Sequence, residues 1–393
     1  MNKFTFSYPT RVYFGEGSAA QAFSAELSKV GETVMLAFGG GSVKGNGVYD
    51  EMKALLTQAG KNVVDFSGIM SNPTYAKVQE GAALAREHGV DCILAVGGGS
   101  VIDCCKVISA QAMLEEDIFN MEYGKGKFPT AGIPMGAVVT ASGTGAEMNP
   151  GAVITCEEKK WKGPIFGTAA SFAVLDPAYT MSVPPMQVLS GAFDTLSHAM
   201  ETYLGTSDKD NVSDDVALAV MRNTVVNMRR LLKDINDLQA RSNLMWDSAM
   251  AENGILKCGR VTDFQGHQIE HQLGAYTDCN HGQGLAVIHP PLYRVMCAKA
   301  PEKFARFAAN VWDISGEGKA ERELAMAGVE ALADFIKECG LPVRLRDLRM
   351  KEEPEKLLTD SMLQEISDSC NLIQTGQAQL THEELFEILV KSL

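Results

Sequence analysis

The sequence predicts an α/β N-terminal domain with a mostly parallel sheet, followed by an all-helical C-terminal domain. Two observations predict the first part: short apolar runs end at glycine-rich turns, and amphipathic helical patterns follow these turns. Strands that alternate with helices in this way form parallel sheets covered on both faces. A third observation predicts the second part: beyond Pro184-Pro185 the segments are long and helical in period, and strand-like alternation nearly vanishes. We therefore place the domains at residues 1–185 and 186–393.

The individual elements follow from the same patterns. The expected strands of the first domain are residues 33–38, 62–68, 93–96, 136–139 and 172–176, and the expected helices lie around Val48 to Leu56 and over 75–87 and 101–111. The expected long helices of the second domain lie within 216–235, 242–256, 323–340 and 382–393. Their Met and Leu stripes at helical spacing are typical of a packed core, which disfavours a hub or scaffold protein.

Composition and charge exclude several function classes. The formal net charge is −14, and no run of Lys or Arg is present. Nucleic acid and anionic membrane surfaces would be repelled, so we expect a small-molecule or protein partner. No apolar stretch could span a bilayer as a helix, and the first residues lack the apolar region of a signal peptide, which predicts a cytoplasmic protein. Nine cysteines without a C-x-x-C pair fit reduced core residues better than a disulfide framework.

Three glycine turns are candidate phosphate sites. They are Gly39-Gly40-Gly41-Ser42, Gly97-Gly98-Gly99-Ser100 and Ser142-Gly143-Thr144-Gly145, each after an apolar run. Backbone N–H groups at a helix start attract phosphate, and glycine lets the phosphate approach. Neither GGGS continues as G-x-G-x-x-G, because Lys44 and Ile102 occupy the third positions, which counts against an ordinary Rossmann fingerprint. Tight βα turns without a ligand are the alternative, which the threefold occurrence disfavours.

The first turn bears on the choice of nucleotide. NAD sites usually offer a carboxylate to the adenosine ribose, whereas a 2′-phosphate requires donors without a nearby negative charge. Residues 39–44, GGGSVK, provide glycines, Ser42 and Lys44 and no acid. If this turn meets the ribose, NADP(H) is favoured, with NAD(H) as the alternative.

Candidate metal ligands lie in two segments of the second domain. Asp194 and His198 are four residues apart and share one face of a helix. A hydrogen-bonded Asp-His pair without metal is the alternative, and this segment alone favours it. His267 and His271 repeat the spacing, and His281 begins a glycine-rich stretch. Carboxylate and imidazole donors suit Fe(II), Zn(II), Co(II) or Mn(II).

The histidines outnumber the ligands that a four-coordinate site needs. The HQIEH run is only superficially similar to the zincin H-E-x-x-H motif, because Glu270 precedes the second histidine instead of following the first. His289, which precedes Pro290-Pro291, is expected to be a loop or packing residue. The residues alone do not decide which histidines bind a metal.

Four motifs resemble the iron-dependent (group III) alcohol dehydrogenases, whose superfamily also contains glycerol dehydrogenase and dehydroquinate synthase. They are GGGSVIDCCK (97–106), TASGTGAE (140–147), DTLSHAMETY (194–203) and GHQIEHQLGAYTDCNHGQG (266–284). The resemblance covers essentially the whole chain, and GGGSVK (39–44) is most similar to the butanol dehydrogenase and NADPH-dependent aldehyde reductase branch. The resemblance implies a dehydroquinate synthase-like fold, an NADP(H) cofactor, one divalent metal ion, Fe2+ or Zn2+, and a homodimer.

The resemblance also implies roles for individual residues. Asp194, His198, His267 and His281 match the metal ligands, whereas His271 matches a histidine that faces the nicotinamide and substrate without binding the metal. Asp103 is expected at the cofactor edge of the active-site cleft. The position at which NAD-preferring relatives carry an acid is Gly40 here. The implied cofactor contacts are Gly39, Gly40, Gly41, Ser42, Asn72, Gly97, Gly98, Gly99, Ser100, Asp103, Thr140, Ser142, Thr144, Val153, Lys162 and Thr180.

These expectations combine into one hypothesis for function: reversible hydride transfer between NADP(H) and a primary alcohol or aldehyde such as butanol or butanal, in a cleft between the two domains. The metal would act as a Lewis acid on the substrate oxygen, and His271 would relay the proton. The nearest alternative is a polyol dehydrogenase or a dehydroquinate-synthase-like lyase on the same scaffold. A non-catalytic metal- or nucleotide-binding regulator is the alternative from another class.

Overall fold

The computed structural model describes residues 2–207, 211–371 and 376–393. They form two compact units. The α/β unit comprises Ser7–Pro184, and the helical unit comprises the described residues from Pro185 onward together with the N-terminal segment up to Phe6.

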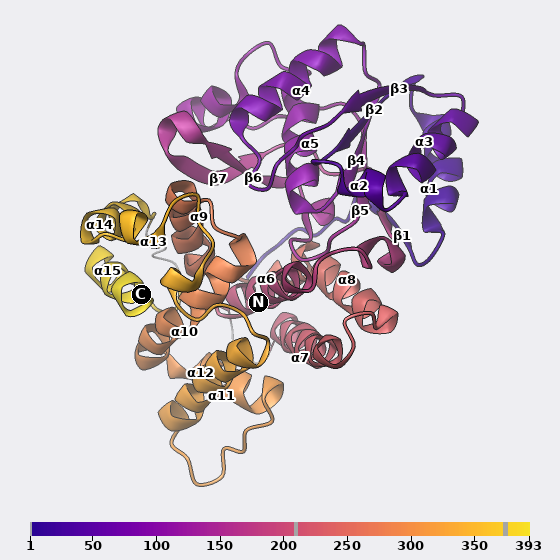
Figure 1. Ribbon diagram of the computed structural model, residues 1–393. Coiled ribbons are helices and arrows are strands. Elements are labelled where there is room, and N and C mark those ends of the chain that lie inside the picture. Colours follow the sequence, from indigo (N-terminus) through magenta and orange to yellow (C-terminus); the bar gives the residue numbers. More distant parts are fainter. Residues whose placement is uncertain (1, 208–210, 372–375) are drawn as a thin grey trace. The chain divides into compact units, whose positions relative to one another are not determined.

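A parallel six-stranded sheet is the centre of the α/β unit, as predicted (Figure 1). Its order is β1-β8-β5-β4-β2-β3, and all five pairs of neighbouring strands are parallel. The strands are β1 (Arg11–Phe14), β2 (Thr33–Phe38), β3 (Asn62–Phe66), β4 (Cys92–Gly97), β5 (Met135–Val139) and β8 (Phe172–Leu175). The central strands β4 and β5 are buried along their whole length, because helices cover both faces of the sheet.

Helices α1 (Ser18–Glu26) and α3 (Val48–Gln58) cover one face, and α4 (Tyr75–Glu87) and α5 (Gly99–Gln111) cover the other (Figure 1). Alternate side chains of β2, beginning with Val34, join the core on the α1 and α3 side, which is the alternation that a strand requires. Phe66 and Ile108 meet beside Gly81 of α4 on the opposite side. Packing on both faces of the sheet keeps the carboxyl ends of its strands next to one another.

Three features of the α/β unit were not predicted. The edge strand β1 is only four residues long, and an antiparallel hairpin of β6 (Gly151–Cys156) and β7 (Trp161–Phe166) contains glycine and proline, which are poor strand formers. A short additional helix, α2 (Ser42–Gly45), precedes the expected helix α3, and Gly47 separates the two in the left-handed conformation at φ +84°.

The helical unit is built from ten α-helices in the described residues, as predicted for the C-terminal part of the chain. They are α6 (Pro185–Tyr203), α7 (Val212–Lys233), α8 (Leu238–Glu252), α9 (Gln265–Thr277), α10 (His281–Lys299), α11 (Pro301–Val311), α12 (Glu321–Glu338), α13 (Pro354–Leu357), α14 (Asp360–Ser369) and α15 (His382–Lys391). Side chains of Asn211, Asp237, Asn280, Thr359 and Thr381 cap the starts of five of them. None of the described helices combines the length and apolar character needed to cross a membrane.

His289 was expected to be a loop or packing residue, and the second alternative is confirmed. His289 does not lie in a loop, because α10 continues through Pro290 and Pro291, but it is a packing residue with no exposed surface. All nine cysteines are buried thiols without a disulfide, in the manner expected of core residues.

Candidate metal centre and nucleotide site

The three predicted phosphate turns follow three adjacent strands of the sheet. Residues 39–42 follow β2, residues 97–100 continue from the end of β4 into α5, and residues 140–145 follow β5. The chain leaves β2 in one direction, to β3, and then returns to its other side as β4, so the first two turns flank the point where the strand order reverses. Open α/β sheets bind nucleotides at the carboxyl ends of the strands at such a point.

Glycine allows the chain to pack closely at two of these turns. A Cβ on Gly99 would lie 2.3 Å from Oγ1 of Thr144, so the second and third turns pack directly against each other. A Cβ on Gly39 would lie 3.2 Å from the carbonyl oxygen of Ile69. Asn72, beyond β3, holds the left-handed conformation at φ +52°, which Asn tolerates better than most residues. The turns therefore form one continuous rim of backbone and small side chains.

Asp103 connects this rim to the β6-β7 hairpin. Its Oδ2 accepts a hydrogen bond of 2.9 Å from the backbone N–H of Val153, and the ammonium of Lys106 lies 3.1 Å from its Oδ1. Lys106 has no exposed surface and also donates to the carbonyl of Gly151. Lys162, on β7, and Thr180, beyond β8, are both buried. Sequence reasoning missed Lys106, since only the three-residue spacing from Asp103 indicated a contact.

Lys44 is the one cation in the first GGGSVK segment. Its Nζ lies 4.8 Å from the ring centroid of Phe38 and 4.6 Å from that of Tyr49. A cation over two ring faces is attracted by their negative quadrupoles. The side chain is therefore directed at the end of β2, beside the turn, although it remains exposed.

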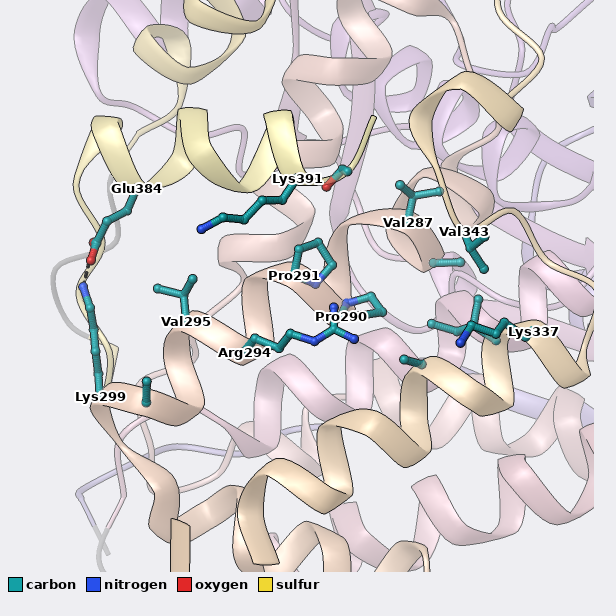
Figure 2. Close-up of a pocket in the computed structure, with 15 residues that line it drawn as sticks. Val287, Pro290, Pro291, Arg294, Val295, Lys299, Lys337, Val343, Glu384 and Lys391 are labelled. Atoms are coloured by element: carbon teal, nitrogen blue, oxygen red, sulfur yellow. Dashed lines mark hydrogen bonds and ion pairs between the residues drawn. The ribbon is translucent and has the colours of Figure 1, made fainter. Parts of the chain in front are cut away.

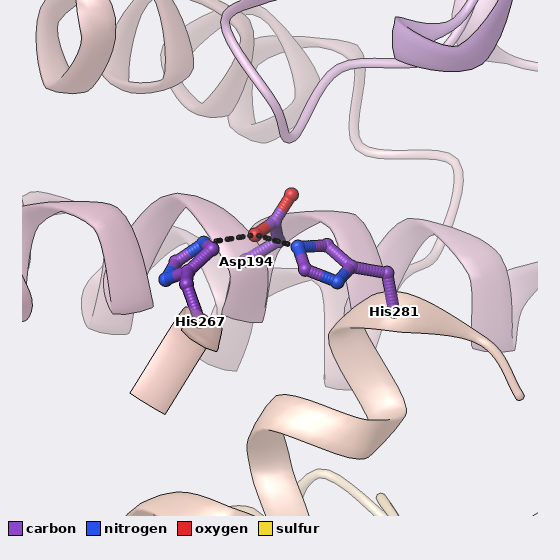
Figure 3. Close-up of side chains that lie close together, drawn as sticks. All are labelled: Asp194, His267 and His281. Carbon is purple, nitrogen blue, oxygen red and sulfur yellow. Dashed lines mark ion pairs between the residues drawn. The ribbon is translucent and has the colours of Figure 1, made fainter. Parts of the chain in front are cut away.

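In the helical unit, three histidines converge on one oxygen atom. Nε2 of His198, of His267 and of His281 each lies 3.5 Å from Oδ1 of Asp194. Figure 3 shows the rings of His267 and His281 pointing from separate segments at this oxygen. Asp194 and His198 come from α6, His267 comes from α9, and His281 is the first residue of α10. The structure thus brings together all four residues predicted as metal ligands.

The spacing of these donors fits a metal ion. Bonds of about 2.0–2.2 Å place the ligands of a tetrahedral metal about 3.4 Å apart. Oδ1 of Asp194 and Nε2 of His267 are buried and have no hydrogen-bond partner in the described residues, which is costly for polar atoms. A divalent cation would satisfy both. One carboxylate and three imidazoles suit Fe(II) or Zn(II) equally well.

The pKa shifts in the cluster arise from the close contact between buried carboxylates and imidazoles. Burial favours the neutral form of Asp194, but the positive field of His198 and the other histidines outweighs it, so the pKa of Asp194 is well below its usual range. Burial opposes charge on His267, whereas the adjacent Glu201 and Asp194 favour it and raise the pKa of His267 to about 10. The carboxylates therefore create a strongly negative environment that attracts a cation.

His271 lies beside this cluster. Its ring centroid is 6.0 Å from that of His267 and 5.5 Å from that of His281, onto which it stacks. Glu270, His271 and His281 also place donor atoms within 4.8 Å of one another. The Nδ1 of His281 that contacts Glu270 is the ring nitrogen opposite the one facing Asp194. Glu270 and Asp194 therefore contact opposite sides of the His281 ring.

A separate groove of about 850 Å³ lies between α10, α12 and α15. Figure 2 shows Lys299 and Glu384, whose ion pair of 2.6 Å connects α10 to α15 beside it. The apolar lining of the groove includes Pro290, Pro291 and Val295. None of the residues that line it is a predicted ligand or cofactor contact.

A parallel sheet with phosphate-type turns and a buried carboxylate-histidine cluster define a class of metal-dependent nucleotide enzymes. Residues 9–177 match the family model of iron-containing alcohol dehydrogenases, and residues 188–393 match that of the Fe-containing alcohol dehydrogenase family, C-terminal. The chain belongs to the iron-containing alcohol dehydrogenase family.

Some relatives are named as NADH-dependent enzymes and others as NADPH-dependent enzymes. The chain is 35% identical to the probable NADH-dependent butanol dehydrogenase 2 of Bacillus subtilis, over 93% of this chain and 94% of that one. It is 34% identical to the NADPH-dependent aldehyde reductase YqhD of Escherichia coli, over 88% and 89%. The crystal structure of NADH-dependent butanol dehydrogenase A from Thermotoga maritima matches with a TM-score of 0.90 at 33% identity, covering 100% of this chain and 99% of that one.

Proposed function

We propose that this protein is a metal-dependent alcohol dehydrogenase and aldehyde reductase that uses NADP(H) and acts on primary alcohols or aldehydes such as butanol and butanal. The convergence of three histidine Nε2 atoms on one oxygen of Asp194 carries this proposal. A cytoplasmic homodimer is part of the proposal, on the resemblance to the family. Relatives named as butanol dehydrogenases and as an aldehyde reductase support the substrate class.

The cluster of Asp194, His198, His267 and His281 would hold one divalent ion, Fe2+ or Zn2+. When bound, the ion supplies Lewis-acid polarisation of the substrate oxygen, and the nicotinamide supplies or accepts hydride. The part of this chain is to hold four donors at fixed spacing and to bury them. Asp194 and His267 are both less than 5% exposed, which excludes water from that side of the site.

The rim of glycine turns would bind the nucleotide phosphates through backbone N–H groups, and Asp103, Val153, Lys162 and Thr180 would complete the site. Lys44 supports NADP(H) over NAD(H), because its ammonium is held by Phe38 and Tyr49 beside a turn without acidic residues. A 2′-phosphate at this turn would be stabilised by that charge.

His271 is proposed to relay the proton of the substrate hydroxyl. It stacks on the ring of His281 and belongs to the same helix as His267, so it lies beside the metal centre without being one of the three histidines that converge on Asp194. A neutral imidazole can accept and release a proton near pH 7.

A polyol dehydrogenase or a dehydroquinate-synthase-like lyase on this scaffold is the second candidate. It would bind a nucleotide and a metal in the same places, and a lyase would cause no net change in NADPH. A regulator without catalysis would bind both and turn over nothing under any metal loading.

The test combines metal analysis with an assay of NADPH oxidation. Protein purified without added metal is analysed for iron and zinc, reconstituted with each, and assayed with butanal and a panel of aldehydes and polyols. We expect one metal per chain and turnover with aldehydes. The variant His271→Ala should retain the metal and lose about 10²-fold or more in turnover, as removal of a general acid or base does. Loss of the metal in this variant would contradict the division of roles, and absence of turnover with every loading would contradict the enzyme.

A further inference from the structure

A buried glutamate faces the outer ring nitrogen of each predicted histidine ligand. Nδ1 of His267 lies 3.2 Å from Oε1 of Glu201, and Nδ1 of His281 contacts Oε2 of Glu270. Nδ1 of His198 lies 3.1 Å from Oε1 of Glu252. These three carboxylates are 1%, 0% and 6% exposed, respectively, which is unusual for glutamate. A pattern that occurs at all three histidines calls for a common explanation.

Each pair joins two different helices. Glu201 of α6 meets His267 of α9, Glu270 of α9 meets His281 of α10, and Glu252 at the end of α8 meets His198 of α6. On α6, Asp194, His198 and Glu201 follow a spacing of four and three residues and therefore share a face. The glutamates thus connect α8, α6, α9 and α10 in series through the imidazole rings.

The surroundings of Glu201 hold its carboxylate in place. It also accepts hydrogen bonds of 3.1 and 3.3 Å from the backbone N–H of His267, and Nε2 of His289 lies 3.3 Å from its Oε1. Ser197 in turn contacts Nε2 of His289 at 2.5 Å. A Cβ on Gly266 would lie 2.3 Å from Oε1 of Glu201, so this glycine provides the space for the carboxylate.

We infer that Glu201, Glu252 and Glu270 are positioning residues that set how tightly the histidines hold their metal; this inference rests on the proposed metal centre. A carboxylate that accepts the Nδ1–H of an imidazole fixes its tautomer, so that the lone pair of Nε2 is directed at Asp194. It also makes that nitrogen a stronger donor. The negative charge of the carboxylates further favours a divalent cation over an uncharged or singly charged occupant.

The three glutamates differ in how strongly they interact with their histidines. Glu252 forms an ion pair of 2.9 Å with Lys257, which offsets the negative charge that it presents to His198. Glu201 and Glu270 form aligned hydrogen bonds with their histidines. Replacement of Glu252 should therefore weaken metal binding least.

The experiment measures metal loss from the holoenzyme. Glu201→Gln, Glu252→Gln and Glu270→Gln remove charge while keeping an oxygen acceptor, and Glu330→Gln, an exposed glutamate paired with Arg294, is the matched control. Metal-loaded proteins are exposed to a chelator, desalted at intervals and analysed for residual metal. We expect metal affinity to fall about 10- to 100-fold for Glu201→Gln and Glu270→Gln, less for Glu252→Gln, and not at all for the control.

Two further readouts separate this role from a purely structural one. The thermal midpoints of the metal-free variants should remain close to that of the metal-free wild type, whereas the rise in midpoint on metal loading should shrink. The visible spectrum of the cobalt-loaded protein should change in Glu201→Gln and Glu270→Gln but not in the control. Metal loss at the wild-type rate in all three variants would overturn the inference and leave the proposed metal centre standing. A wild type that binds no metal would overturn both.

Discussion

A single carboxylate oxygen, Oδ1 of Asp194, is the point on which the candidate metal centre depends. Three Nε2 atoms lie 3.5 Å from it, too far for good hydrogen bonds and close to the spacing of ligands around a metal. The spacing of four residues between Asp194 and His198 was readable from the sequence. Residue spacing alone did not decide which other histidines complete the site, because the positions of α9 and α10 are set by tertiary packing. Only the family resemblance pointed to His267 and His281 and left His271 out.

Lys44→Ala should separate the two nucleotides. The variant loses a charge next to the first glycine turn, so we expect KM for NADPH to rise about tenfold or more, as for the loss of a contact worth about 1.5–3 kcal/mol. KM for NADH should change little, because NADH lacks the 2′-phosphate. Steady-state kinetics with both nucleotides check this. Equal changes for both would show that Lys44 does not meet the ribose phosphate.

Gly266→Ala should damage the metal centre without touching a ligand. The added Cβ would lie 2.3 Å from Oε1 of Glu201 and 2.6 Å from Cε1 of His289. Overpacking of this kind costs about 1–3 kcal/mol in unfolding free energy. We expect that loss in urea denaturation, together with weaker metal retention. Gly124→Ala, where the Cβ meets nothing within 4 Å, is the control and should behave as the wild type.

At the scale of elements, the parallel strands and long helices were predictable because their hydrophobic periods are continuous. Strand β2 and helix α4 have the predicted bounds. The β6-β7 hairpin was not predictable, since Gly163 and Pro164 disrupt the strand pattern and its position depends on the contact of Val153 with Asp103. The roles of Glu201, Glu252 and Glu270 were not predictable for a similar reason: their histidine partners lie on other helices.

The contact between α7 and α8 provides a pH-dependent prediction. Asp247 of α8 is buried against Asn223 and Thr224 of α7, and burial raises the pKa of Asp247 to about 6. Its pKa in the unfolded chain is about 3.9. As pH rises from 4 to 6, the unfolded state releases the proton before the folded state does, so stability is lost over this window.

Asp247→Asn removes this dependence. Relative to the variant, the metal-free wild type should lose on the order of 2 kcal/mol of unfolding free energy between about pH 4 and pH 6, and only about 0.4 kcal/mol more between pH 6 and pH 7.5. Urea unfolding of both proteins at pH 4.5, 6 and 7.5 gives this difference directly. A difference between the two proteins that is the same at all three pH values would contradict the raised pKa.

At the scale of the whole molecule, the proposed reaction needs both units. The α/β unit contributes the glycine turns at the ends of β2, β4 and β5, and the helical unit contributes Asp194 and the histidines. The sequence motifs predicted the class of each unit because each motif is local. They did not predict Lys106 or Glu201, whose roles arise only when distant segments pack together.

We propose that one metal ion binds to Asp194, His198, His267 and His281. A crystal structure of the metal-loaded protein, with anomalous diffraction at the absorption edge of the metal found by analysis, tests it most directly. We predict a single anomalous peak about 2.0–2.2 Å from Oδ1 of Asp194 and from the three Nε2 atoms, with His271 outside the coordination sphere. A peak coordinated by His271 or Glu270 in place of any of these four would contradict the account.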